Sequence, residues 1–230
     1  MTYQETLRFL ESRGNQGIKL GLDRMGKLMT FLGRPNMDYP TVLVGGTNGK
    51  GSTVRMLSQI LSEGGYRVGS YYSPHLHTFR ERFCVNDLPI SEEEFADLGQ
   101  AVRRLAGGTA DPPSQFELLT TMAFLYFRRM GVQIGILEVG LGGRWDATNC
   151  ADPLVSVVTN VELDHTTRLG STLEEIAREK AGIVRTGRPL ILGALKERPG
   201  QVIEDICAQL GAAVIGTLPA ECMGQDVSGE

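Results

Sequence analysis

The residues with the clearest chemical potential lie in the glycine-rich segment Gly45–Thr53, whose sequence is Gly-Gly-Thr-Asn-Gly-Lys-Gly-Ser-Thr. A β-branched apolar run precedes it, and the apolar spacing after it is typical of a helix. A strand, a glycine-rich turn and a helix in this order direct backbone N–H groups and a helix N-terminus at an anion. Lys50 can reach terminal phosphates, and the hydroxyl of Ser52 or Thr53 can bind Mg²⁺. The segment therefore predicts a phosphate-binding loop.

The match to the general phosphate-loop pattern is imperfect. Counted from Gly45, three residues instead of four precede Gly49 and Lys50, and Gly51 separates the lysine from Ser52. A glycine-rich β-turn that binds nothing is the simpler alternative. Several glycines and one lysine at the mouth of a helix favour the phosphate loop.

Three further polar groups lie at the ends of predicted strands. They are Ser73 after residues 67–72, Glu138 at the end of 134–138 and His165 beyond 154–159. Ligands of parallel α/β sheets bind beyond the carboxyl ends of the strands, so these groups and the phosphate loop are expected to share one site. A buried, unpaired carboxylate at Glu138 would be costly, and a hard cation such as Mg²⁺ would neutralise it. The pattern predicts a site for Mg²⁺ and nucleotide phosphates.

Glu138 and His165 also have simpler interpretations, as do two further charged residues, Lys180 and Arg144. Glu138 could cap the turn that follows it, His165 could be a core histidine, and Lys180 could serve the dipole of the helix that it ends. Arg144 could pair with a bound anion or with Asp146. The residues alone leave these alternatives open.

The elements that would position these groups alternate between strands and helices. Strands are expected at residues 41–44, 67–72, 134–138, 154–159, 190–192 and 213–215. Helices are expected at residues 3–13, 22–32, 54–61, 91–105, 116–130, 171–181 and 202–210. Capping boxes are expected at Ser91/Glu94, Ser114/Glu117 and Ser171/Glu174. Continuous apolar strands separated by helices predict an α/β fold with a mostly parallel sheet and helices on both faces.

The composition is that of an ordinary globular protein. The chain has 230 residues, of which 41% are hydrophobic and 22% charged, enough to bury a core. A net charge of −4 without a basic run gives no support to a nucleic-acid partner. Four dispersed cysteines predict a reducing compartment and no cysteine metal site. Without a signal peptide or a membrane-spanning run, we expect a cytoplasmic protein with no membrane partner. We also expect a monomer that acts on small molecules.

Five motifs, taken together, carry a resemblance to a known family. They are Val44–Ser52, Tyr72–Leu76, Leu137–Asn149, Leu163–Thr166 and Arg178–Ile183. In this order they resemble the folylpolyglutamate synthase / dihydrofolate synthase family, which belongs to the Mur ligase superfamily, and they span nearly the whole chain. The resemblance implies a phosphate-loop domain of the Mur ligase type at residues 1–216. Residues 217–230 would then be a tail or the start of a linker to a further, C-terminal domain.

The chemistry of that family would make the chain part of an ATP-dependent ligase that forms a carbon–nitrogen bond. The family phosphorylates a carboxylate of dihydropteroate or folate with ATP, and the amine of L-glutamate then displaces phosphate from the acyl phosphate. The resemblance thus implies ATP and Mg²⁺ as cofactors. Mg²⁺ and Lys50 would stabilise the charge on the transferred phosphoryl group.

The resemblance also implies roles for individual residues. The ATP phosphates would be held by Gly46, Thr47, Asn48, Gly49, Lys50, Gly51, Ser52 and Thr53. Mg²⁺ would be bound by Ser73, Glu138, His165 and Lys180, the last as a carbamylated lysine. The catalytic residues would be Lys50, His165 and Lys180. The pterin substrate would contact Gly17, Ile18, Lys19, Leu20, His75, Arg82, Ser114, Gln115, Phe116, Glu117, Trp145, Asp146 and Ala147.

The chain departs from the family at two positions. Trp145 stands where a leucine is usual, which would reshape the pterin pocket, and Glu162 stands where a small residue is usual, which would add negative charge near the metal. Because the family's C-terminal domain completes the ATP site, we expect these 230 residues alone to bind nucleotide weakly and turn over slowly. Two alternatives are a Mur-type ligase acting on another carboxylate acceptor and a non-catalytic nucleotide-binding module.

Overall fold

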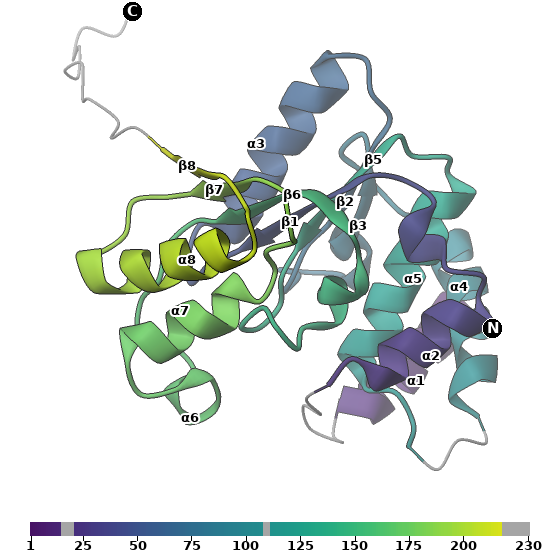
Figure 1. The fold of residues 1–230 in the computed structure, drawn as a ribbon. Coiled ribbons are helices and arrows are strands. Elements are labelled where there is room, and N and C mark those ends of the chain that lie inside the picture. Colours follow the sequence, from purple (N-terminus) through teal and green to yellow (C-terminus); the bar gives the residue numbers. More distant parts are fainter. Residues whose placement is uncertain (15–20, 108–110, 218–230) are drawn as a thin grey trace, which may run out of the picture.

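The computed structural model describes residues 1–14, 21–107 and 111–217, which pack around one sheet (Figure 1). In the described part the sheet has eight strands in the order β4-β3-β2-β5-β1-β6-β7-β8. Their bounds are β1 Thr41–Gly45, β2 Val68–Tyr71, β3 Phe83–Val85, β4 Leu88–Pro89, β5 Ile134–Glu138, β6 Pro153–Val158, β7 Leu190–Leu192 and β8 Val214–Gly216. The strands from β2 to β8 in this order are parallel neighbours, and β3 and β4 are antiparallel. The predicted mostly parallel sheet is confirmed.

The helices occupy the segments between these strands. They are α1 Tyr3–Gly14, α2 Asp23–Phe31, α3 Lys50–Glu63, α4 Glu92–Ala106, α5 Gln115–Arg129, α6 Thr166–Leu169, α7 Leu173–Ala181 and α8 Glu197–Gln209. Short 3₁₀ turns are η1 Pro35–Met37, η2 Phe79–Arg82 and η3 Ala147–Cys150. No helix of the described residues is both long and apolar enough to cross a membrane.

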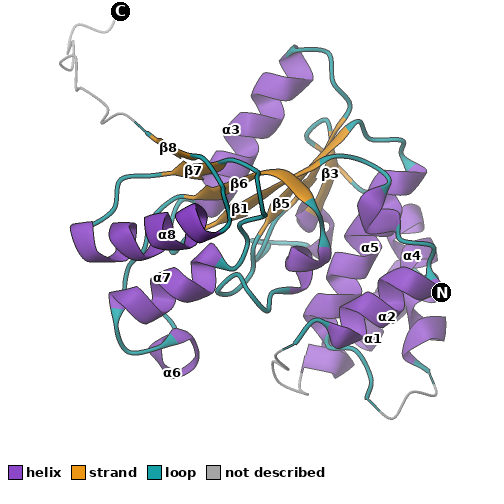
Figure 2. Cartoon of the chain, viewed as in Figure 1, coloured by secondary structure: helices purple, strands orange, loops and turns teal. Residues whose placement is uncertain are grey.

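Helices cover both faces of the sheet, as predicted (Figure 2). Val42 and Val44 of β1 pack against Val54 of α3 on one face, while Leu43 joins the larger core on the other. This alternation is the period of two of a strand between two apolar layers. On the larger side α5 is apolar almost all round because α1, α2 and α4 pack against it in turn.

One of the three predicted capping boxes is wrong. The boxes at Ser91/Glu94 and Ser114/Glu117 form, but α7 is capped by Thr172 and Glu175, one residue later than predicted. The sequence fits both registers, and the later one buries Ile176 and Ala177 in the core. Helix α8 begins at Glu197, earlier than the predicted start at residue 202. Pro199 lies in its first turn, where a proline is tolerated because the N–H group at that position has no partner within the helix.

The strand order makes neighbours of the strands that lead to the phosphate loop, Ser73, Glu138 and His165. Strands β2, β5, β1 and β6 are consecutive and parallel in the sheet. Their carboxyl ends therefore lie at one edge, and the loops that follow them meet there. The prediction that the motifs converge is confirmed.

Candidate functional site

The phosphate loop runs from the end of β1 to the first turn of α3 and needs glycine at its start. Gly46 has φ +140°, and a Cβ atom there would lie 1.9 Å from Thr159 Oγ1. A larger residue would break this contact between the loop and the segment after β6. The last glycine before the helix, Gly49, is also left-handed, with φ +78°. Together they turn the chain so that the helix N-terminus opens at the sheet edge.

Two residues after β6 hold the loop in place, and the sequence analysis did not single them out. Asn160 Oδ1 accepts hydrogen bonds from the amides of Thr47, at 3.1 Å, and Asn48, at 2.8 Å. The hydroxyl of Thr159 donates to the carbonyl of Asn48 at 2.6 Å. The amides of Thr47 and Asn48 are thus occupied within the chain, and phosphate contacts by N–H groups fall to the later residues of the loop. A Thr-Asn pair at the end of a predicted strand was the available signal.

We expect Asn160→Ala to loosen the loop at one identifiable amide. The Asn48 amide loses its acceptor, whereas the Thr47 amide keeps the backbone carbonyl of Asn160 at 3.1 Å. Amide hydrogen exchange should therefore speed up at Asn48 and change little at Thr47. Binding of the ATP analogue AMPPCP should weaken by about tenfold, the size of one or two lost hydrogen bonds. Unchanged exchange at Asn48 would contradict the role given to Asn160.

Glu138 and Ser73 form an oxygen-rich corner beside the loop. Glu138 is 6% exposed, and its Oε2 accepts a hydrogen bond from the Ser73 amide at 3.1 Å. The carboxylate also lies against Gly51, where an added Cβ would be 3.3 Å from Oε2. It therefore links the loop after the neighbouring strand to the phosphate loop, and does not cap its own turn. Burial raises the pKa of Glu138, although the Ser73 amide and Lys50 oppose the shift.

The donor atoms of this corner suit a hard cation. The hydroxyl oxygen of Ser73 is buried, and in the described part of the chain it has no hydrogen-bond partner. A buried hydroxyl that lacks a partner, beside a buried carboxylate, is a costly arrangement unless a ligand binds both. Oxygen ligands at the edge of a nucleotide site are those that Mg²⁺ prefers. Ser73 and Glu138 thus fit the predicted metal, although no cluster of three His, Cys, Asp or Glu side chains occurs among the described residues.

Lys50 and Thr53 lie at the start of α3 with their polar atoms engaged locally. The ammonium of Lys50 donates to the carbonyl of Thr47 at 3.0 Å. The hydroxyl of Thr53 donates to the carbonyl of Gly49 at 2.9 Å, inside the first turn of the helix. The hydroxyl of Ser52 forms no such bond with any residue that the structure describes, which leaves Ser52 the better candidate of the two for a metal-bound hydroxyl.

His165 and Lys180 come from later segments, His165 from the segment after β6 and Lys180 from the last turn of α7. The side chain of His165 is 57% exposed, so the core alternative is wrong, and its φ of 48° turns the chain at this point. Lys180 is 3% exposed in the last turn of α7, and none of the described residues forms a hydrogen bond with its ammonium. Burial, together with nearby Lys50, lowers the pKa of Lys180 to about 8, and Asp164 acts in the opposite direction. Lys180 is therefore no ordinary surface lysine at a helix end.

The departure at Glu162 does not add an uncompensated charge. Its carboxylate pairs with the ammonium of Lys196 at 3.0 Å. The backbone of Glu162 also bonds with the hydroxyl of Thr47. The residue thus ties the phosphate loop to the segment between β7 and α8.

The loop after β5 lies directly on the last turn of α7. A Cβ atom on Gly143 would be 2.6 Å from the carbonyl oxygen of Glu179, so this contact requires glycine. The alternative that Arg144 pairs with Asp146 is wrong, because the guanidinium of Arg144 approaches Glu179, at 3.9 Å. Asp146 is buried, and it accepts the amides of Leu141, at 2.9 Å, and Thr148, at 3.0 Å. Burial raises the pKa of Asp146.

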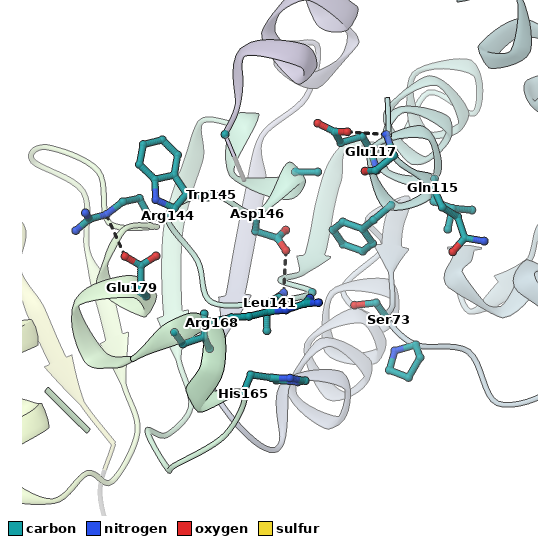
Figure 3. Close-up of a pocket in the computed structure, with 18 of the residues that line it drawn as sticks. Ser73, Gln115, Glu117, Leu141, Arg144, Trp145, Asp146, His165, Arg168 and Glu179 are labelled. Carbon is teal, nitrogen blue, oxygen red and sulfur yellow. Dashed lines mark hydrogen bonds and ion pairs between the residues drawn. The ribbon is translucent and has the colours of Figure 1, made fainter. Parts of the chain in front are cut away.

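A cavity of about 880 Å³ opens beside this corner and gathers most of the predicted substrate contacts (Figure 3). Its lining includes Arg82, residues 114–117 and residues 145–147, together with Ser73 and His165. Trp145 is 45% exposed, so a flat face of its ring is available to a ligand. The predicted contacts Gly17, Ile18, Lys19 and Leu20 lie outside the described residues.

Two predicted substrate contacts, His75 and Glu117, form hydrogen bonds with neighbouring protein residues. His75 is not on the cavity wall, and its Nδ1 accepts a hydrogen bond from Arg82 Nε at 2.9 Å. Burial and the charge of Arg82 lower the pKa of His75, which keeps this nitrogen an acceptor. Glu117 receives the Ser114 amide at 2.7 Å and Arg24 Nε at 2.9 Å, and so holds α2 to the start of α5.

The sequence analysis missed several residues of the cavity wall. Arg13, Arg168, Arg178 and Glu179 all line it. Glu175, Arg178 and Glu179 are three and four residues apart on α7, so they share one face of the helix. That spacing was visible in the sequence, but its direction toward the cavity was not.

Comparisons with known proteins agree with this geometry. Residues 44–191 match the Mur ligase middle domain. The chain is 43% identical over 206 residues to the dihydrofolate synthase/folylpolyglutamate synthase of Bacillus subtilis (strain 168), which covers 87% of this chain and 48% of that protein. It resembles the crystal structure of folylpolyglutamate synthase from Thermotoga maritima with a TM-score of 0.86 and 43% identity, over 93% of this chain and 49% of that one. A solved FPGS complex with AMPPCP and folate gives a TM-score of 0.88 and 35% identity, over 94% and 54% of the two chains. The chain thus spans about half the length of these relatives.

Proposed function

Because the chain belongs to the Mur ligase family, whose middle domain matches residues 44–191, we propose that it is the nucleotide- and pterin-binding part of an ATP-dependent ligase. The ligase would join L-glutamate to dihydropteroate or a folate. The observation that supports this most is the 880 Å³ cavity that shares Ser73 and His165 with the edge where the phosphate loop lies. The names of the relatives and the FPGS complex with AMPPCP and folate support the same substrates. We also propose that residues 1–216 form one domain.

The proposed nucleotide site consists of the N-terminus of α3 and its loop. The amides that follow Asn48, with Lys50 and Ser52, would hold the phosphates of ATP, while Ser73, Glu138, His165 and Lys180 would hold Mg²⁺. Bound Mg-ATP supplies the phosphoryl group that turns a substrate carboxylate into an electrophile for the amine of glutamate, with loss of phosphate. Lys50 places a fixed positive charge where the phosphates gather, and Glu138 is kept in position by the Ser73 amide at 3.1 Å.

The proposed acceptor site is the cavity itself. Phe116, at the start of α5, and Trp145, in the loop before η3, both line it and would hold the flat pterin and benzoyl rings. The carboxylate of the acceptor would then lie toward Ser73 and His165. Arg82, held by His75, lines the cavity, and its charge acts on Glu138.

We expect Lys180 to be carbamylated, as the resemblance implies. An amine in its neutral form adds CO₂ to give a carbamate and one proton, and the carbamate is an anionic oxygen ligand. The lysine is buried beside Lys50, so an added negative charge would relieve the repulsion between two cations. With ¹³C-bicarbonate at pH 8, the ¹³C NMR spectrum should show one carbamate resonance. The resonance should be absent in Lys180→Met and present in Lys196→Met, and a signal that survives Lys180→Met would rule the assignment out.

Binding and turnover together test the proposed function. Titrations should detect AMPPCP binding that depends on Mg²⁺, and pteroate binding through the fluorescence of Trp145, the one tryptophan of the chain. Phosphate release should require ATP, Mg²⁺, dihydropteroate and L-glutamate together. Turnover with another carboxylate acceptor in place of dihydropteroate would favour a Mur-type ligase of different substrate. Nucleotide binding without any acceptor binding would favour a non-catalytic module.

A further inference from the structure

Arginines dominate the charge on the cavity wall. Those that line it are Arg13, Arg82, Arg144, Arg168 and Arg178. Arg82 Nε donates to His75, and Arg144 approaches Glu179 at 3.9 Å. Arg168 and Arg178 are exposed, and no described residue offers either of them a hydrogen-bond acceptor or an ion-pair partner. These two guanidinium groups are therefore available to a ligand.

The acidic side chains on the same wall form no ion pair with Arg168 or Arg178 among the described residues, because other donors already engage these carboxylates. Glu117 binds the Ser114 amide and Arg24, and Asp146 binds two amides of its own loop. Glu175 accepts the amide of Ser171 at 2.7 Å as part of the cap of α7. That capping role explains why Glu175 does not pair with Arg178, although the two are one turn apart. Among the described residues, five arginines and four carboxylates line the cavity, so its wall carries a net positive formal charge.

Arg168 stands along the path that an extended acceptor would take, and Arg178 lines the same cavity. Arg168 lies on α6 and Arg178 on α7, and Figure 3 shows Arg168 between Arg144 and His165, with Gln115 on the opposite side of the cavity. The ring-binding residue Trp145 is farther along the same wall. A molecule with its rings near Trp145 and its reacting carboxylate near His165 would pass the guanidinium group of Arg168, and Arg178 lines the same cavity.

The chemistry of the possible acceptors distinguishes them at this point. Dihydropteroate carries one carboxylate, which is the group to be activated. Each glutamyl residue of a folate tail adds one α-carboxylate that the reaction does not use. Such carboxylates would be poorly placed near ATP phosphates unless arginines bound them, and the planar fork of a guanidinium matches a carboxylate with two hydrogen bonds.

We propose that Arg168 and Arg178 bind the α-carboxylates of glutamyl residues on the acceptor, so that the cavity prefers glutamylated folates to dihydropteroate. This rests on the proposed function and names the substrate class of the same site. Both residues determine specificity and take no part in phosphoryl transfer. Free L-glutamate carries the same chemistry, so the test must separate the acceptor's tail from the incoming amino acid.

The test compares ligands that differ only in glutamyl content. Pteroate, folate, pteroyltriglutamate and L-glutamate are titrated into the chain, followed by Trp145 fluorescence corrected for ligand absorbance and by calorimetry. The triglutamate should bind at least about tenfold more tightly than pteroate at low salt, and the advantage should shrink as salt screens the charges. In the double variant Arg168→Gln/Arg178→Gln the advantage should fall to within about twofold, with pteroate affinity unchanged.

Two control variants and three outcomes make the result decisive. Arg198→Gln, an exposed arginine of α8 away from the cavity lining, removes the same charge and should keep the advantage. Arg178→Lys should keep part of it. If pteroate binds but the triglutamate gains nothing, or the double variant keeps the gain, the inference fails and the proposed function stands. If only L-glutamate depends on the two arginines, they serve the incoming amino acid and the inference also fails. If neither pteroate nor AMPPCP binds, the proposed function itself fails.

Discussion

Lys50→Ala is expected to weaken the binding of Mg-AMPPCP by roughly 10- to 100-fold, the range for a lost charge-assisted contact with a phosphate. The ammonium is the cation of the phosphate loop, and it donates a hydrogen bond to the Thr47 carbonyl at 3.0 Å. The loop therefore keeps the lysine close to where the phosphates would bind. Any phosphate release in the ligase assay should fall further, by roughly 100- to 1000-fold, because the same charge would stabilise the transferred phosphoryl group.

The matched control is Lys196→Ala, which removes a lysine from the same edge of the sheet. Its ammonium pairs with Glu162, and the variant should bind Mg-AMPPCP within about twofold of the parent chain, as expected for an exposed ion pair. Circular dichroism should show both variants folded, since each loses one surface contact. Equal losses in the two variants would mean that net charge alone attracts the nucleotide, and the loop assignment would be wrong.

Glu138→Gln should separate stability from function. The carboxylate is 6% exposed, and burial raises its pKa, so its charged form is unfavourable in the folded chain. Glutamine keeps an acceptor for the Ser73 amide but binds Mg²⁺ poorly. We expect the Mg²⁺-dependent part of AMPPCP binding to weaken by at least roughly 10- to 100-fold, as for other disrupted metal sites.

The same variant should be at least as stable as the parent chain when no metal is added. Because the folded-state pKa of Glu138 is raised, the stability linked to its proton is present at low pH and is lost as pH rises through that pKa. Thermal melts should therefore show an equal or higher Tm for Glu138→Gln at pH 8, with the difference shrinking toward pH 4. Glu162→Gln, at an exposed carboxylate of the same edge, should leave the Mg²⁺ dependence unchanged. A variant of Glu138 that melts lower yet keeps its Mg²⁺ response would reverse the assignment of the site.

The elements of the fold followed from local patterns in the sequence. Val42 and Val44 alternate with Leu43 because a strand between two layers of helices must bury both of its faces. The boxes at Ser91 and Ser114 predicted two helix starts, since a short side chain and a glutamate three residues later satisfy each other's amides. The third box failed because two overlapping registers satisfy that local rule, and packing of the core chose between them.

The candidate site divides in the same way. Glycines, Lys50 and strand-end polar groups mark the site by residue type, and the parallel direction of the strands follows from apolar strands separated by helices. The order β2-β5-β1-β6, which makes these strands neighbours, came from the structure. Asn160 went unnoticed because its importance lies in an acceptor atom that meets two amides more than a hundred residues earlier in the chain. The sequence offered Arg144 a bound anion or Asp146 as partner, and the structure instead brings its guanidinium near Glu179, because Gly143 lies on the backbone of α7.

The sequence by itself determined which chemical groups are present and that the ends of neighbouring strands bring them to one edge, because strand and helix periodicity are local properties. Only the tertiary structure decided which groups face one another. In the structure Lys180 is buried and His165 is exposed. The carboxylates of Glu117 and Glu175 accept hydrogen bonds from backbone amides, and Arg168 and Arg178 line the cavity. The physical reason is that burial and pairing depend on contacts between segments far apart in the chain, which no local pattern encodes.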